Sequence, residues 1–170
     1  HRGRGVASAA IARTLHAIAE GGRAAFYDGP LAASIADGVQ AAGGCMTADD
    51  LRDHAADVLE PLAIDYRGYT VVETPPNSQG LILLEELRII EGYELARWGH
   101  LSLEATHHMI EAKKLAFEDR QRLAGDPAFT GFDPAMLLAP EHAAGRRAQI
   151  DPLRARRVPA ATPSSDTTSF

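Results

Sequence analysis

Four residues between positions 104 and 111 carry the side chains best suited to metal binding or acid–base chemistry. Glu104, His107, His108 and Glu111 fall within about two turns of one expected helix. His107 and Glu111 are four residues apart and share a face of that helix, and an imidazole with a carboxylate at this spacing can hold a divalent metal ion. Neither an HExxH pattern nor a third strong ligand accompanies them. The pattern therefore favours surface or packed histidines over a metal site.

Charged residues follow in two further groups. Glu118, Asp119 and Arg120 are adjacent and allow an acid–base pair, although an ion pair on or between helices is the commoner use of such residues. The second group contains Arg146, Arg147, Arg154, Arg156 and Arg157. The net charge of −6 argues against nucleic acid or an anionic membrane as the main partner. We therefore expect these arginines in a solvated helix end and loop, with a phosphate-binding patch as the alternative.

Composition disfavours several other kinds of site. Cys45 is the single cysteine, which excludes an intrachain disulfide and a thiolate-rich metal site, and we expect it to be a small buried residue rather than a nucleophile. The glycine pairs form neither GxGxxG nor a phosphate loop with lysine, so a nucleotide site has no support. No run approaches about 18 apolar residues, so no membrane span is expected. With 170 residues, 45% of them hydrophobic, the chain can form one medium domain with a core.

The elements that would position these residues are mainly helices. Ile11, Leu15 and Ile18 are spaced as on one buried face of a helix, which should run from Ala7 to Glu20 and stop at Gly21–Gly22. Three further helices are expected in the first two thirds of the chain: from Pro30 to about Ala42, after the N-cap Thr47, and from Leu81 to a stop at Gly92. Three more are expected after them: from the N-cap Ser102 to about Leu123, after Asp133–Pro134, and from Pro140 to Ile150. In the helix after Ser102, the expected buried stripe is Ala105, Met109, Ala112 and Ala116.

A β-hairpin is expected between these helices. Leu62, Ile64 and Tyr66 alternate with polar or small residues, and a turn at Gly68 leads into a second strand from Tyr69. Pro75–Pro76 must end that strand, and the helix that follows is apolar on most sides and so should be buried. The sequence therefore predicts an α+β fold, mostly helical with a small hairpin.

The end of the chain changes in composition. Residues 151–165 are rich in Pro, Arg, Ala, Ser and Thr without a period, which is typical of an extended, poorly packed connection. Asp166, Thr167, Thr168 and Ser169 then precede the last residue. By themselves, hydroxyl residues at a chain end indicate no more than a frayed tail.

Seven longer segments change that interpretation. They are TLHAIAEGG (14–22) with AFYDGPLA (25–32), AAGGCMTADDL (41–51), EPLAIDYRGYTVVETPPNSQG (60–80), HHMIEAKKLAFEDR (107–120) with GDPAF (125–129), and DTTSF (166–170). Together they are spread over almost the whole chain, from position 14 to position 170. In order and spacing, this series resembles the γ-glutamyltranspeptidase family, from the C-terminal part of its large subunit into the first residues of its small subunit.

The resemblance implies an N-terminal nucleophile (Ntn) hydrolase, an αββα sandwich made as one precursor that cuts itself before a threonine. Thr167 matches that threonine, so the bond expected to be cleaved is Asp166–Thr167. Residues 1–150 would form the large-subunit helical region with the hairpin. Residues 151–166 would be a flexible connection to the processing site, and residues 167–170 the start of the small subunit.

The chemistry that the resemblance implies suits threonine. A hydroxyl is a weak nucleophile that needs a base, and the α-amino group freed by cleavage, with a pKa near ~8, can serve. Thr167 would attack a γ-glutamyl amide such as glutathione and pass the acyl group to water or an amino acid. Thr168 matches a family threonine that supports the nucleophile by hydrogen bonding. Ser169 stands where histidine is more usual, which weakens an inference of standard glutathione specificity.

The resemblance also implies what must come from elsewhere. The family's substrate-binding arginine would precede His1 and its oxyanion-hole glycines would follow Phe170, so we expect this polypeptide alone to be inactive. The expected partners are the remaining large- and small-subunit segments of the same precursor and a γ-glutamyl substrate, without a metal or other cofactor. The family suggests a periplasmic or extracellular location, with the cytoplasm as the alternative.

Two rival functions remain open. One is a related Ntn amidase of the cephalosporin acylase, oxamate amidohydrolase or polyglutamate depolymerase type. The other is a non-catalytic helical scaffold, which would not cut itself at all.

Overall fold

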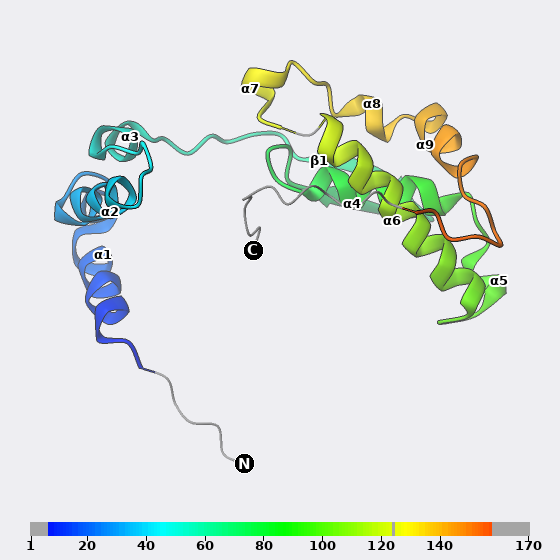
Figure 1. Ribbon diagram of the computed structural model, residues 1–170, viewed down its shortest axis with the longest axis horizontal. Helices are drawn as coiled ribbons and strands as arrows, with labels where there is room; N and C mark the ends of the chain where they lie inside the picture. Colours follow the sequence, from blue (N-terminus) through cyan, green and yellow to red (C-terminus); the bar gives the residue numbers. More distant parts are fainter. Residues whose placement is uncertain (1–6, 124, 158–170) are drawn as a thin grey trace, which may run out of the picture. The chain divides into compact units, whose positions relative to one another are not determined.

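The computed structural model describes residues 7–123 and 125–157 (Figure 1). In chain order the elements are α1 (Ala9–Tyr27), α2 (Pro30–Ala41), α3 (Ala48–Asp53), β1 (Leu62–Tyr66), β2 (Tyr69–Glu73), α4 (Gly80–Glu91), α5 (Leu95–Trp98), α6 (Leu103–Leu123), α7 (Pro127–Thr130), α8 (Ala135–Leu138) and α9 (Pro140–Arg147). They form two compact units, one ending at Val58 and the other beginning at Leu59. The expected fold class, mostly helical with a small hairpin, is confirmed. The expected division into residues 1–150, 151–166 and 167–170 stays a prediction.

The first unit contains α1, α2 and α3. The Ser8 hydroxyl caps α1 by accepting a hydrogen bond from the N–H of Ile11 at 3.3 Å, and Gly22, with φ of 58°, kinks the helix where the glycine pair predicted a stop. Thr47 and Asp50 form a reciprocal capping box at the start of α3, which confirms the predicted N-cap.

Two expectations about burial in this unit are wrong. Ile11 and Leu15 are 62% and 60% exposed, because the helices that α1 packs against among the described residues of its unit, α2 and α3, are short. Cys45 is exposed, since it lies in the loop between α2 and α3 rather than on a packed helix face.

The second unit is built around α4. Strands β1 and β2 pair antiparallel, with Leu62 opposite Glu73 and Tyr66 opposite Tyr69. Arg67 and Gly68 both have positive φ in the two-residue turn, as the right-handed twist of a hairpin favours. Helix α4 packs against β1, α6, α8 and α9, and Figure 1 shows α6 crossing in front of α4. The core cluster is Ile89, Ile90, Ala112, Leu115, Ala143 and Ile150. The buried helix predicted after Pro75–Pro76 is confirmed.

Helix α6 has the predicted length but a different buried face. Ser102 caps it, with its hydroxyl accepting from the N–H of Ala105 at 3.1 Å. Met109, expected in the core, is 51% exposed. The buried side chains are Ala105, His108, Glu111, Ala112, Leu115, Ala116 and Asp119. Three of these are polar or charged, so the inner face of α6 depends on partners from other segments.

The glycine at position 92, at the end of α4, is explained by the close approach of a side chain and not by an unusual backbone conformation. Its φ is −72°, an ordinary value for any residue. A Cβ at this position would lie 2.5 Å from the Arg147 side chain, whose Nη1 donates to the carbonyl oxygen of Arg88 at 2.8 Å. The arginine thus satisfies a carbonyl in the last turn of α4.

Within the residues that the structure describes, no helix combines the length and hydropathy needed to cross a membrane.

Candidate functional site

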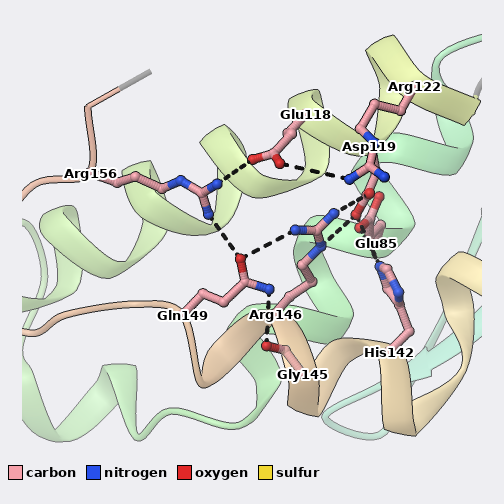
Figure 2. Close-up of polar contacts among 9 residues, drawn as sticks. All are labelled: Glu85, Glu118, Asp119, Arg122, His142, Gly145, Arg146, Gln149 and Arg156. Atoms are coloured by element: carbon pink, nitrogen blue, oxygen red, sulfur yellow. Dashed lines mark hydrogen bonds and ion pairs between the residues drawn. The ribbon is translucent and has the colours of Figure 1, made fainter. Parts of the chain in front are cut away.

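The residues expected to carry catalysis lie outside the described part of the chain. Asp166, Thr167 and Thr168 fall within residues 158–170, so the expected self-cleavage site stays a prediction. The site that the structure does describe is a cluster of buried charges between α4, α6 and α9 (Figure 2).

The pair His107 and Glu111 is engaged with protein groups rather than arranged as metal ligands. His107 Nε2 lies 2.8 Å from the carbonyl oxygen of Asp151. The Glu111 carboxylate is buried and accepts from Lys114 Nζ at 2.6 Å and from the main-chain N–H of Arg156 at 3.0 Å. The packed alternative is therefore what the structure supports.

His108 is also a packed residue. Its Nδ1 lies 2.7 Å from the carbonyl oxygen of Glu104. Its ring centroid lies 4.6 Å from that of Tyr93 and 4.5 Å from that of Trp98, so the imidazole belongs to an aromatic cluster.

The buried-charge cluster consists of Glu85 on α4, Asp119 on α6, and His142 and Arg146 on α9. The Arg146 guanidinium forms a bidentate salt bridge with the Asp119 carboxylate, in which Nε donates to Oδ2 at 2.7 Å and Nη2 donates to Oδ1. His142 Nε2 lies 2.9 Å from Glu85 Oε1 and 3.1 Å from Asp119 Oδ2. One imidazole nitrogen therefore lies within hydrogen-bonding distance of two carboxyl groups from different helices (Figure 2).

The two acids in this cluster are tuned in opposite directions. Burial by itself would raise the pKa of Asp119, but hydrogen bonds from Arg146 and Glu85 outweigh it and lower that pKa below its usual value. Burial is the main cause that raises the pKa of Glu85 to about 9, and the neighbouring Asp119 adds to it. At neutral pH Asp119 is therefore ionised and Glu85 carries a proton.

One oxygen of the buried Glu85 carboxyl group receives no hydrogen bond within the described part of the chain, which agrees with a protonated group. Glu85 Oε2 is buried and receives no hydrogen bond from any described residue, yet the Glu85 carboxyl hydrogen-bonds to Asp119. A neutral carboxylic acid donates such a bond, whereas a carboxylate cannot. Arg146 and Asp119 then cancel each other's charge, and Glu85 adds none.

The cluster could in principle hold a cation, because Glu85, Asp119 and His142 each offer a ligand atom within 4.8 Å of the others. Two observations argue against that use. Both oxygens of Asp119 are taken by Arg146, and Glu85 would first have to lose its proton. We interpret the cluster as a buried polar network that joins three helices.

A second, connected network lies along α6. Glu118 Oε2 accepts from Arg156 Nη2 at 2.6 Å, and Gln149 Oε1 accepts from Arg156 Nη1 at 3.0 Å. The same Gln149 oxygen lies 3.4 Å from Arg146 Nη1, so the two networks meet there (Figure 2). The solvated role expected for the arginines is wrong for Arg146, which is buried, and Arg156 is half-buried.

Arg120 takes no part in these networks, although it follows Asp119 directly in the sequence. It lines a polar pocket of about 380 Å³ at the start of α4, together with Pro76, Asn77, Ser78, Gln79, Ile82, Gln121 and Gly125. Its guanidinium carbon lies 5.7 Å from the Phe117 ring centroid, and it forms no ion pair with a described carboxylate. The acid–base pair that adjacency allowed is therefore not formed.

Sequence reasoning missed Glu85, His142 and the burial of Arg146. Glu85 lies four residues from both Leu81 and Ile89, which are fully buried. A glutamate on the same face as two core residues of an apolar helix was the available signal. Its partners are more than 20 residues away in the sequence, so spacing alone could not identify them.

Comparison with known proteins assigns the chain to a family. The gamma-glutamyltranspeptidase family model matches residues 1–170. A glutathione hydrolase-like YwrD proenzyme of Bacillus subtilis (strain 168) is 42% identical over 133 residues, which are 78% of this chain and 25% of the relative. The chain thus spans about a quarter of that relative's length.

Solved structures agree. The cephalosporin acylase from Bacillus halodurans is 40% identical, with a TM-score of 0.73 over 82% of this chain and 26% of the acylase chain. The Helicobacter pylori gamma-glutamyltranspeptidase is 28% identical, with a TM-score of 0.75 over 94% of this chain and 44% of the other. From its sequence match and its fold together, the chain belongs to the gamma-glutamyltranspeptidase family.

Proposed function

We propose that this chain is part of a precursor that cuts itself between Asp166 and Thr167 and then hydrolyses or transfers γ-glutamyl groups. The observation that carries the proposal is the family match, which extends through residues 166–168, with a relative described as a glutathione hydrolase-like proenzyme. Residues up to Asp166 would belong to the larger product, and Thr167 would begin the smaller one.

The proposed cleavage needs no reactant other than the precursor itself and water. Thr167 Oγ attacks the carbonyl carbon of Asp166, the C–N bond breaks as the acyl group moves from nitrogen to oxygen, and the nitrogen takes the hydroxyl proton. Water then hydrolyses the ester, which leaves a carboxylate on Asp166 and a free hydroxyl and amine on Thr167. That amine is the base for the next reaction of the same hydroxyl. Thr168 supports the nucleophilic hydroxyl of Thr167 by hydrogen bonding.

The test is self-cleavage of the full-length precursor. We expect two chains on a denaturing gel and a new N-terminus at Thr167, and a Thr167→Ala variant that stays a single chain. Ser164→Ala is the matched control, because it also removes a hydroxyl near the bond and should cleave normally. A wild-type precursor that remains one chain would refute the proposal and favour a non-catalytic scaffold.

A second candidate is an amidase acting on a different acyl group. It is favoured by the 40% identity to a cephalosporin acylase and by Ser169 in place of the usual histidine. The processed enzyme should be assayed with γ-glutamyl-p-nitroanilide and with glutaryl and oxamate amides. Turnover of the γ-glutamyl substrate supports the leading proposal, and turnover of the other amides without it supports the second.

A further inference from the structure

The segment that leads toward the expected cleavage site is held firmly at one residue. Both main-chain hydrogen-bonding groups of Arg156 are taken by side chains of α6. Its N–H donates to Glu111 Oε2 at 3.0 Å, and its carbonyl oxygen accepts from Lys114 Nζ at 3.0 Å. Glu111 and Lys114 are themselves paired at 2.6 Å, so the two side chains that bind the Arg156 main chain also contact each other.

The Arg156 side chain adds a second attachment to the same helix. It donates to Glu118 Oε2 at 2.6 Å and to Gln149 Oε1 at 3.0 Å. The same Gln149 oxygen also accepts from Arg146, whose guanidinium donates to the buried Asp119 carboxylate. Figure 2 shows this path from Arg156 to the buried-charge cluster.

The electrostatics keep this attachment, which we call the Arg156 clamp (Glu111, Lys114, Glu118 and Arg156), in place at neutral pH. Burial of Glu111 would raise its pKa, but hydrogen bonds from Lys114 and from the Arg156 N–H outweigh burial and lower the pKa below its usual value. Glu111 is therefore ionised, and charge-assisted hydrogen bonds of this kind are stronger than neutral ones.

The neighbouring arginines are not held in this way. Arg154 and Arg157 are exposed, and within the described residues their side chains make no hydrogen bond or ion pair. The contrast shows that the contacts depend on the position of Arg156 and not on positive charge in general.

We propose that Arg156 is a positioning residue for the self-cleavage reaction. Asp166 is ten residues beyond it, and a chain of that length spans at most about 36 Å. Fixing the segment at Arg156 therefore limits where the scissile bond can lie relative to the rest of the precursor, and cleavage requires that bond to be aligned with the groups that stabilise its transition state. The inference rests on the proposed function, because it assigns a role in the cleavage proposed there.

The test compares Arg156→Ala with Arg157→Ala in the full-length precursor. We expect Arg156→Ala to slow the first-order cleavage rate by roughly tenfold or more, and Arg157→Ala to cleave like the wild type although it is closer to the bond. Thermal midpoints should be measured with Thr167→Ala added, so that each precursor stays intact. A positioning role predicts similar midpoints for the two arginine variants.

A charge swap separates this role from general loss of packing. Glu118→Arg should slow cleavage by itself, and combining it with Arg156→Glu should restore part of the rate. If wild type cleaves and Arg156→Ala keeps pace with Arg157→Ala, the inference is wrong while the proposed function stands. Slow cleavage accompanied by a matching drop in thermal midpoint, with no rescue by the swap, would also overturn it. A wild-type precursor that never cleaves would instead refute the proposed function.

Discussion

Glu85 is a buried carboxylic acid that keeps its proton at neutral pH, and this should make the protein's stability depend on pH. The pKa of Glu85 is about 9 in the fold and near 4.5 in the unfolded chain. The contribution of the protonated Glu85 to the free energy of unfolding is fully present below the pKa of the unfolded chain. It is lost as pH rises from that pKa through the pKa of the folded state, because between the two values only the unfolded chain releases the proton.

Replacing Glu85 with glutamine tests this assignment. A Glu85→Gln variant keeps a neutral donor toward Asp119 and an acceptor for His142, so we expect it to be more stable than wild type at pH 7 by about 1–3 kcal/mol. Its denaturation midpoint should change less between pH 5 and pH 8. Glu141→Gln, at an exposed position on α9, is the control. A Glu85→Gln variant with the wild-type pH profile would show that Glu85 is ionised in the fold.

The sequence identified only some of the residues that form the buried-charge cluster, and it did not identify which of them pair with each other. Asp119 was a candidate because it stands in a charged group, but its adjacent Arg120 was the natural partner to expect. The actual partner, Arg146, is 27 residues away. A one-dimensional pattern shows which side chains share a helix face, whereas an ion pair between helices depends on how those helices pack.

At the scale of elements, Gly80 is required by the approach of α4 to the hairpin rather than by its own backbone conformation. A Cβ at Gly80 would lie 2.7 Å from the carbonyl oxygen of Thr74 and 2.7 Å from Glu73 Cβ. We expect Gly80→Ala to lower the free energy of unfolding by about 1–3 kcal/mol, although alanine is the better helix former.

The control for this prediction is another helical glycine in the same unit. Gly145 on α9 has open space where a Cβ would be, so Gly145→Ala should be neutral or should stabilise by up to about 1 kcal/mol. Denaturant titrations of the two variants provide the comparison. Equal effects would mean that α4 does not approach β2 as closely as the structure shows.

Long elements with clear signals were predictable from the sequence, and short ones were not. The N-caps Thr47 and Ser102 and the strands of the hairpin were all identified, because each carries a local chemical signal. Helices α5 and α7 have four residues each, too few to show a hydrophobic period. The buried face of α6 was misassigned because Met109 is apolar, while the charges that replace it in the core are paired with residues beyond position 145.

At the scale of the whole molecule, the two units differ in how much they bury. Among the described residues of the first unit, those fully buried are Ala32 and Ala36, whereas the second unit buries long aliphatic side chains such as Leu84, Ile89 and Leu115. Buried apolar area is the main favourable contribution to stability, and an alanine contributes much less of it than a leucine. The two units should therefore differ in local stability even though they are one chain.

Hydrogen–deuterium exchange followed by mass spectrometry measures this difference directly. Amides in α4 and α6 should exchange only through the rarer, larger openings of their unit, because both helices are packed on buried neighbours. Amides in α1 should exchange at least about tenfold faster, which corresponds to a difference of about 1.4 kcal/mol in opening free energy. The capped α3 serves as an internal reference, since it shares the unit but has its own capping box. Equal protection of α1 and α4 would mean that the first unit gains stability from contacts other than those within it.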